Sequence, residues 1–311
     1  MTQDRPNFAI MGTGGIGGYF GARLARSGFD TTFVARGTHL QAISQSGLRV
    51  EDGGESFSIK GKATEDPRDI GHVDFVLFAV KLWDAAEAGA ACRPLVGPDT
   101  AVVSLLNGVE SEEMLASVLG RDQVMGGVAE ISATIAAPGV IKKVSPFALI
   151  RFGELDRSRS PRAQTLAAAL SQAGIGVDLS EDINLAIWNK FVFLTGLSAI
   201  TAITRHPIGR VRADPDTRAL LEEIMHEALR VGQAAGVPIK DAVISERLQF
   251  IDGLVPEIRA SMAVDLLAGR RLELPWLSGA VVRKGTELGI ATPANAFVCK
   301  ALKLDVLGAQ R

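Results

Sequence analysis

The first half of the chain alternates short apolar runs with stretches in which apolar and polar residues mix. Val73–Val80 and Thr100–Leu106 are predominantly apolar, which is typical of parallel strands buried on both faces of a sheet. Further strands are predicted at Asn7–Met11, Thr31–Ala35, Gln123–Ala129 and Ile175–Leu179, with helices that end near Ser27 and that cover Arg162–Ala173. This alternation predicts an α/β fold with a Rossmann-type, doubly wound parallel sheet.

Two more strands are predicted close together in sequence. Val140–Ser145 and Ala148–Gly153 are separated by a short segment that contains Pro146. Strands joined by so short a connection pair antiparallel, because a parallel pair needs a long crossover. We therefore expect these two strands to form an antiparallel addition to the sheet.

From Ile183 onward the pattern is helical throughout. The predicted helices are Ile183–Ile203, Asp216–Ala235, Lys240–Asp252, Pro256–Leu267, Pro275–Leu288 and Pro293–Leu307. Prolines near the first turn and glycines after the last turn mark several of their ends. The sequence thus predicts two domains, a Rossmann-type domain over residues 1–182 and an all-helical domain over residues 183–311.

Composition narrows the class of protein. With 47% hydrophobic and 22% charged residues, the chain can bury a core, which excludes general disorder. The formal net charge is −2 and offers no field for a nucleic-acid backbone, so no such partner is expected. Two cysteines form no disulfide framework, no residue cluster suggests a metal, and neither a signal peptide nor a membrane span is apparent; we expect a cytoplasmic protein.

A glycine-rich turn follows the first predicted strand and opens a helix. Gly12, Thr13, Gly14, Gly15, Ile16 and Gly17 fit the pattern G-x-G-x-x-G. In this context the first glycine allows the tight turn, the second lets a pyrophosphate approach the backbone, and the third lets helix and strand pack closely. The turn predicts a dinucleotide site at the helix N-terminus.

The residue that follows the second strand indicates which dinucleotide binds. An NAD site usually has Asp or Glu about 20 residues beyond the turn, but here Arg36 stands at that place. A guanidinium can bind a 2′-phosphate through paired, charge-assisted hydrogen bonds. Arg36 therefore favours NADPH, although an exposed arginine without function remains an alternative.

Three further polar residues draw attention. Lys81 and Asn107 follow the strands Val73–Val80 and Thr100–Leu106, and ligands bind at the carboxyl ends of strands in open α/β sheets. Lys190 lies in an apolar helix, where an ammonium group is unfavourable without a partner. A lysine that extends its end to solvent is the alternative interpretation of Lys190.

The motifs together resemble the ketopantoate reductase (2-dehydropantoate 2-reductase) family, within the 6-phosphogluconate-dehydrogenase-like superfamily. The matching segments, in order, are IMGTGGIGG, VARG, AVKLWD, LLNGVES, W-N-K around Lys190, SMAVDLLAGRRLE and GIATPAN. They span nearly the entire chain. The resemblance implies reduction of a 2-oxo acid with NADPH, most simply 2-dehydropantoate to pantoate in pantothenate biosynthesis, and a homodimer.

The resemblance also implies roles for individual residues. The glycine turn, Arg36 and Lys81 would bind NADP, and Asn107 would contact both cofactor and substrate. Lys190 would be the general acid, Ser261 would bind the carboxylate end of the substrate, and Glu273 would lie near the nicotinamide and orient the lysine. A positioned ammonium stabilises the negative charge that hydride addition places on the carbonyl oxygen, and it delivers the proton.

The chain departs from the family pattern at four positions. The family often has asparagines where Leu194 and Ser198 stand, and Pro275 and Ser278 also replace polar family residues. Ser198 is still expected to contact substrate. Because a site that hydrogen-bonds a hydroxyl discriminates strongly, these changes bear more on substrate choice than on chemistry. A reductase of another branched 2-oxo or hydroxy acid, and a protein that senses NADP(H) without turnover, remain alternatives.

Overall fold

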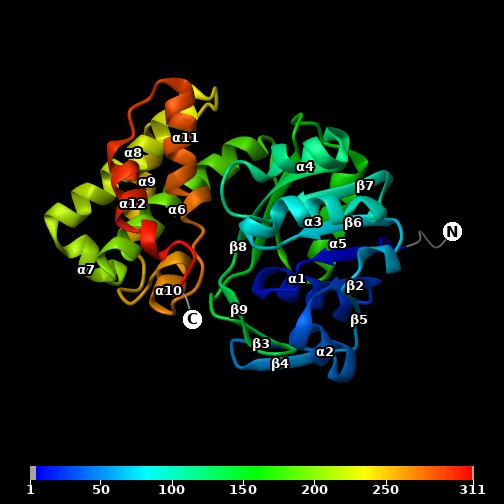
Figure 1. Cartoon of the computed structure of the whole chain (residues 1–311). Helices are drawn as coiled ribbons and strands as arrows, with labels where there is room; N and C mark the ends of the chain where they lie inside the picture. The colour runs from blue at the N-terminus through cyan, green and yellow to red at the C-terminus, as the bar shows by residue number, and fades with distance from the viewer. Residues whose placement is uncertain (1–4, 310–311) are drawn as a thin grey trace. The chain divides into compact units, whose positions relative to one another are not determined.

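The computed structural model describes residues 5–309 and divides into two compact units (Figure 1). The first contains the chain up to Leu106 together with Glu110–Ile183. The second contains Asn107–Val109 and the chain from Asn184 onward. The chain therefore leaves the first unit for three residues in the middle of its course, at Asn107.

An eight-stranded sheet forms the centre of the first unit. Its order is β12-β11-β8-β7-β6-β1-β2-β5. The strands are β1 (Phe8–Met11), β2 (Thr31–Val34), β5 (Lys62–Thr64), β6 (Val73–Phe78), β7 (Val96–Ser104), β8 (Val124–Glu130), β11 (Leu149–Glu154) and β12 (Gly176–Leu179). β1 pairs in parallel with β2 on one side and with β6 on the other. The order reverses between β1 and β6, so the sheet is doubly wound and the predicted α/β fold is confirmed.

The helices of this unit connect successive strands. They are α1 (Gly15–Arg26), α2 (Gly37–Ser46), α3 (Ala85–Ala91), α4 (Ser111–Leu119) and α5 (Pro161–Gln172), with 3-10 turns η1 (Pro67–Asp69), η2 (Leu82–Asp84), η3 (Arg93–Leu95) and η4 (Arg121–Gln123). α5 begins where Ser160 Oγ accepts a hydrogen bond from Ala163 N and Pro161 occupies the first turn, both favourable at a helix start.

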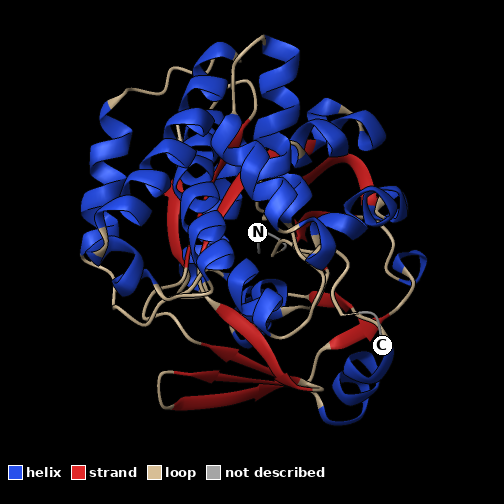
Figure 2. Cartoon of the chain, turned by 60° about the vertical axis from the view of Figure 1, so that its left-hand side comes forward, coloured by secondary structure: helices blue, strands red, loops and turns tan. Residues whose placement is uncertain are grey.

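A second sheet, which the sequence did not predict, covers α1. Its order is β4 (Glu55–Ile59), β3 (Leu48–Asp52), β10 (Val140–Lys143) and β9 (Ala133–Ala137), and Figure 2 shows it as a separate group of strands in the lower part of the view. The Ile141 side chain of β10 lies against Gly18 of α1. Tyr19 donates from its hydroxyl to Asp52 at 2.8 Å, and Lys143 pairs with the same carboxylate at 2.6 Å.

The predicted pairing of Val140–Ser145 with Ala148–Gly153 is wrong. β10 pairs with β3 and β9 in the small sheet, whereas β11 lies in the main sheet, antiparallel to β8 and parallel to β12. An antiparallel strand is therefore present in the main sheet, but it is β11 and its antiparallel partner is β8. The two strands diverge because each finds its apolar neighbours in a different layer, Ile141 against α1 and Ile150 in the main sheet.

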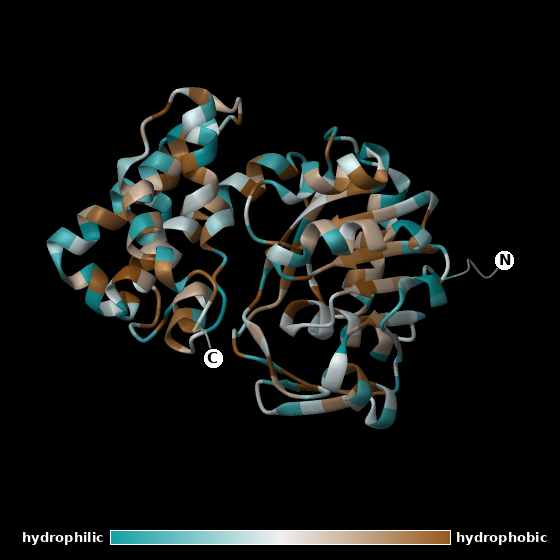
Figure 3. Ribbon diagram, in the orientation of Figure 1, coloured by the Kyte–Doolittle hydropathy of each residue, from teal (hydrophilic) through white to brown (hydrophobic). Residues whose placement is uncertain are grey.

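The second unit is helical apart from its connections. Its helices are α6 (Ile183–Thr204), α7 (Ile208–Ala213), α8 (Pro215–Ala234), α9 (Ala242–Asp252), α10 (Ser261–Leu267), α11 (Ser278–Leu288) and α12 (Pro293–Ala301), with η5 (Leu274–Trp276) and η6 (Lys303–Asp305). Buried residues of these helices form one core, which is separate from the core of the first unit. Figure 3 shows hydrophobic residues along the main-sheet strands, and hydrophobic and hydrophilic residues mixed on the helices of the second unit.

Three predicted helices are shorter than expected. Pro256–Leu267 is helical only from Ser261, because the carbonyls of Pro256 and Ile258 accept hydrogen bonds from Gly209 and Ile208. Pro275–Leu288 is interrupted at Leu277, whose ψ is −102°, and Pro293–Leu307 ends at Ala301 before a 3-10 turn.

Helix α6 is long and apolar enough to pass a composition test for a membrane span. Its mean hydropathy reaches 1.4, but 72% of the window concerned is buried inside the protein. Glu227 of the neighbouring α8 is also buried, and its carboxylate accepts hydrogen bonds from the backbone of Ala294 and Asn295 at 2.8 and 2.9 Å. Residues of α6 therefore belong to the core of the second unit.

Candidate functional site

The glycine turn has the geometry that its sequence predicts. Gly12 has φ of +96°, and a side chain there would place its Cβ 2.8 Å from Ala79 O and Val80 N. Gly17 packs directly onto the carbonyl of Gly12 and onto Ile10. Both glycines are needed because the turn presses α1 against β1 and β6.

Gly14 differs from its neighbours because its environment is open. A Cβ on Gly14 would have no heavy atom within 4 Å, and Gly14 is the N-cap of α1 with φ of −78°. Neither packing nor backbone strain requires glycine there. Open space at a helix N-terminus is what a pyrophosphate group requires.

Gly15 has a structural role that the motif did not indicate. A Cβ on Gly15 would collide with the backbone of Ala133 and Thr134 in β9. β9 therefore lies directly against the first turn of α1. Of the predicted cofactor residues, Gly14 is the one whose missing side chain leaves room for a ligand.

Two other residues of the turn direct their side chains inward. Thr13 is buried, and both its N–H and its hydroxyl donate to Val34 O, at 3.1 and 2.9 Å. Ile16 packs against the core of the first unit. Thr13 therefore fixes the turn to the end of β2.

Arg36 stands where β2 ends and α2 begins. It is exposed, and it is the N-cap residue of α2. Nearby, His39 Nδ1 accepts a hydrogen bond from Gly139 N at 3.0 Å, and burial lowers the pKa of His39. The imidazole is thus neutral with its proton on Nε2, which is buried and faces the Thr13 backbone without a hydrogen bond of normal geometry.

Lys81 lies at the switch point of the sheet. Ala79 N donates to Met11 O at 2.8 Å, so the end of β6 runs beside the glycine turn. Lys81 follows two residues later and is exposed, with its Nζ 5.3 Å from the centre of the Trp83 ring. Such a distance is within the range of a cation–π contact. The structure brings Lys81 and the glycine turn to the same edge of the sheet.

Three of the predicted residues are joined by hydrogen bonds in the second unit. Lys190 Nζ donates to Asn107 Oδ1 at 3.0 Å, and Asn107 Nδ2 donates to Glu273 Oε2 at 3.3 Å. The amide orientation follows from chemistry, since an ammonium can only donate and a carboxylate accepts. Glu273 is 8% exposed. An ammonium group is thereby held in a fixed place with a carboxylate as its nearby counter-charge.

The other predicted substrate residues lie at or near the later turns of α6. Ala260 N donates to Thr201 Oγ1 at 3.4 Å, which brings the start of α10, and thus Ser261, to a point three turns beyond Lys190. Ser261 is exposed. Ser198 is fully buried, and its Oγ has no hydrogen-bond partner among the described residues. The structure therefore brings Asn107, Lys190 and Glu273 together but encloses Ser198 in the helical core.

Two of the departures from the family pattern can be located. Leu194 is one turn beyond Lys190 and packs partly buried against the helical core, so it offers no hydrogen bond. Ser278 is fully buried at the start of α11, and its hydroxyl also lacks a partner in the described part of the chain. The face of α6 that carries Lys190 is consequently apolar one turn onward.

The sequence analysis missed a buried carboxyl group near Asn107. Glu112 lies in the first turn of α4, and burial raises the pKa of its carboxyl group from 4.5 to about 7. The available signal was a serine and two acidic residues after Asn107-Gly108, a pattern that favours a helix start.

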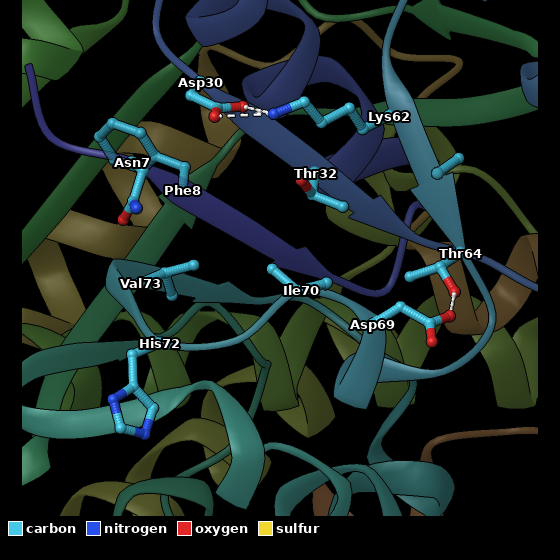
Figure 4. Close-up of a pocket in the computed structure, with 11 residues that line it drawn as sticks. Asn7, Phe8, Asp30, Thr32, Lys62, Thr64, Asp69, Ile70, His72 and Val73 are labelled. Atoms are coloured by element: carbon cyan, nitrogen blue, oxygen red, sulfur yellow. Dashed lines mark hydrogen bonds and ion pairs between the residues drawn. The ribbon is translucent and has the colours of Figure 1, made fainter.

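A cavity of about 370 Å³ opens elsewhere in the first unit (Figure 4). It is lined by Asn7, Asp30, Lys62 and His72, among others, which precede or begin strands. Asp30 and Lys62 are paired with each other at 2.8 Å. This is the amino-terminal edge of the sheet, opposite to the edge of the glycine turn, and ligands of open α/β sheets bind at the carboxyl ends.

Comparison with known proteins matches most of the chain to one family. The model of the family "Ketopantoate reductase PanE/ApbA" matches residues 8–157, and the model of its C-terminal domain matches residues 182–305. A 2-dehydropantoate 2-reductase of Mesorhizobium japonicum is 33% identical over 307 residues, covering 91% of this chain and 93% of the relative. A PanE/ApbA family ketopantoate reductase from Ralstonia eutropha has a TM-score of 0.89 at 32% identity, covering 96% of this chain and 98% of its own.

By class, then, the protein is an oxidoreductase. Its two matched segments together span most of the chain, and the chain belongs to the ketopantoate reductase family. The same fold also occurs in a protein of lower sequence identity. A D-mandelate dehydrogenase solved with NADH and anilino(oxo)acetate has a TM-score of 0.89 at 22% identity, covering 96% of this chain and 98% of its own.

Proposed function

We propose that the protein reduces a 2-oxo acid with NADPH, and that 2-dehydropantoate is its first candidate substrate. The observation that carries the proposal is the hydrogen-bonded series Lys190–Asn107–Glu273, which provides a placed proton donor. Relatives that share about a third of the sequence are named 2-dehydropantoate 2-reductases.

The residues of the first unit fit a dinucleotide phosphate. The open space at Gly14 and the N-terminus of α1 would hold the pyrophosphate, and Lys81 lies at the same edge of the sheet. The exposed Arg36 at the end of β2 would pair with the 2′-phosphate, for which its fork of donors is suited. NADPH bound in this way would supply the hydride.

The chain's own residues would manage the charge and the proton. Negative charge develops on the carbonyl oxygen as the carbonyl carbon is reduced, and the Lys190 ammonium stabilises this charge and then donates a proton from Nζ to the oxygen. Asn107 Oδ1 fixes the direction of Nζ, and Glu273 fixes the Asn107 amide from its other end. Ser261, exposed at the start of α10, is the candidate to bind the substrate carboxylate.

A second candidate substrate class follows from Leu194. This side chain occupies the position one turn beyond Lys190, and an apolar group there favours a substrate with an apolar branch over one with a hydroxyl. A pocket built to bond a hydroxyl rejects analogues that lack it far more strongly than an apolar pocket rejects the hydroxyl. Another branched 2-oxo acid is therefore the alternative to 2-dehydropantoate.

The decisive experiment measures NADPH oxidation with 2-dehydropantoate and a panel of branched and unbranched 2-oxo acids, for the wild type and for Lys190→Ala. We expect Lys190→Ala to lose at least ~10²-fold in kcat, the usual scale for a general acid, while NADPH binding is retained. Lys240→Ala is the matched control, because Lys240 is an exposed lysine of the same unit. Tight NADPH binding without turnover of any 2-oxo acid would instead indicate a sensor.

A further inference from the structure

The two ends of the loop that carries Asn107 are joined by buried side chains. Ser104 is the last residue of β7 and Ser111 is the first residue of α4, so residues 105–110 make up the entire connection. The Oγ atoms of Ser104 and Ser111 lie 2.8 Å apart, and both residues are buried. We call Ser104, Ser111 and Glu112 the loop clamp.

The hydrogen bonds of the loop clamp run in one direction. Ser111 Oγ donates to Glu112 Oε2 at 3.0 Å. Because a serine hydroxyl has a single proton, Ser111 must accept from Ser104. The series therefore runs from Ser104 through Ser111 to the Glu112 carboxylate, and each hydroxyl is a donor to the next group.

The Glu112 carboxyl group is the last acceptor of this series. Part of the Glu112 side chain is exposed, but its carboxyl group is withdrawn from water, and this burial raises its pKa. The hydroxyls of Ser111 and Ser104 and the N–H groups of Glu112 and Gly127 lie near it and oppose the rise. Gly127 of β8 has no room for a side chain against Ser104 O, so the carboxyl group is enclosed by β7, β8 and α4.

Other charged residues near α4 are not the main influences on the pKa of the Glu112 carboxyl group. The elements that pack against α4 are α3, β7, β8 and η4. Their ionisable residues, with those beside Glu112 on its own segment, are Glu87, Asp99, Arg121, Asp122, Glu130, Glu110 and Glu113. None of them is among the groups with the largest effects on the Glu112 carboxyl.

We propose that Ser104, Ser111 and Glu112 are positioning residues for Asn107, an inference that rests on the proposed reduction. The chain leaves the first unit between Leu106 and Glu110, and the clamp fixes the points where it departs and returns. With both ends fixed, fewer loop conformations are available, and less entropy is lost when the Asn107 amide bonds Lys190 and Glu273.

Ionisation of Glu112 weakens the clamp. The closed clamp keeps the carboxyl group from water, and this burial raises its pKa, so the ionised form favours an opened arrangement in which water reaches the carboxylate. The loop that presents Asn107 is therefore best ordered while Glu112 is protonated, below about pH 7.

The first test compares pH profiles of kcat/KM in Glu112→Gln, Glu113→Gln and the wild type. Gln keeps an acceptor oxygen but cannot ionise, and the exposed Glu113 is the matched control. We expect kcat/KM of the wild type and of Glu113→Gln to fall about tenfold, the scale of one hydrogen bond, as the pH rises through about 7. Glu112→Gln lacks this step. The same step in Glu112→Gln would overturn the proposal.

The second test does not depend on activity. Hydrogen exchange of the amides in residues 105–110 is measured in the wild type, Ser111→Ala and Glu113→Gln. We expect Ser111→Ala to accelerate exchange about tenfold and Glu113→Gln to leave it unchanged. Unchanged exchange in Ser111→Ala refutes the clamp. A wild type that turns over no 2-oxo acid refutes the proposed function, and exchange then decides the clamp alone.

Discussion

The Lys190 ammonium donates to the side-chain carbonyl of Asn107 at 3.0 Å, across 83 positions of sequence. Asn107 in turn donates to Glu273, 166 positions further along. A single amide thus bonds two groups of opposite charge that lie far apart in the sequence. Asn107 is therefore the link that holds the Lys190 ammonium near the Glu273 carboxylate.

Replacing this link should therefore lower turnover more than substrate binding. We expect Asn107→Ala to reduce kcat by about 10²-fold, the scale for removal of one preorganised polar group, because Nζ is no longer directed. Asn184→Ala is the control, since Asn184 is exposed near the start of α6. Steady-state kinetics with the best substrate of the panel check this. Equal kcat values for the two variants would contradict the role of Asn107.

Arg36 should decide between the two nicotinamide cofactors. We expect Arg36→Asp to weaken NADPH binding by roughly 10- to 100-fold, the scale of a charge-assisted hydrogen bond, and to leave NADH binding nearly unchanged. Only NADPH has the 2′-phosphate. The control is Arg93→Asp, an exposed arginine in the turn that precedes β7. Titration of both cofactors against both variants measures the difference, and equal losses for NADPH and NADH would exclude this role.

Gly14 and Gly15 should respond differently to the same substitution. Gly14→Ala meets open space, so we expect its free energy of unfolding to equal that of the wild type. We expect dinucleotide binding to weaken at least tenfold, because the methyl group would occupy the place of the pyrophosphate. Gly15→Ala meets the backbone of β9 and should lower the free energy of unfolding by about 1–3 kcal/mol. Denaturant unfolding and cofactor titration of the two variants separate these effects. Weak binding with full stability in Gly15→Ala would reverse the assignment.

Glu112 should make stability depend on pH in an unusual direction. Burial raises the pKa of its carboxyl group from 4.5 to about 7, so the folded protein binds this proton more tightly than the unfolded chain does. The contribution is complete below about pH 4.5 and is lost as the pH rises through about 7, by up to about 3 kcal/mol.

Denaturant unfolding across this pH range is the measurement. The free energy of unfolding of the wild type and of Glu113→Gln should decrease as the pH rises through about 7. That of Glu112→Gln should change much less over the same range. A wild-type curve with no difference from Glu112→Gln between pH 5 and pH 8 would place the carboxyl group in water.

The sequence predicted the features that depend on local pattern. The glycine turn, the main-sheet strands and Lys81 follow from apolar runs and from residues at strand ends. The second sheet did not follow, because β4 and β9 are short and largely exposed, so no apolar alternation marks them. β3 also pairs with β10 far along the chain, and such pairing depends on tertiary context.

The site could be predicted only in part for the same reason. Lys190 was recognisable as a charge in an apolar helix, but its hydrogen bond to Asn107 required the folded chain. Glu273 and Ser261 entered only through family resemblance. Glu112 was missed because a glutamate in the first turn of a helix is normally exposed, and its enclosure depends on how closely β8 approaches β7 at Gly127.

The contact between Gly15 and β9 bears on how the protein is made. Ala133 and Thr134 are translated more than a hundred residues after Gly15, so a nascent chain that ends before them leaves the first turn of α1 uncovered. The first turn of α1 is therefore covered only after β9 (Ala133–Ala137) has been made, and a ribosome-bound fragment of the earlier strands and helices lacks its finished form.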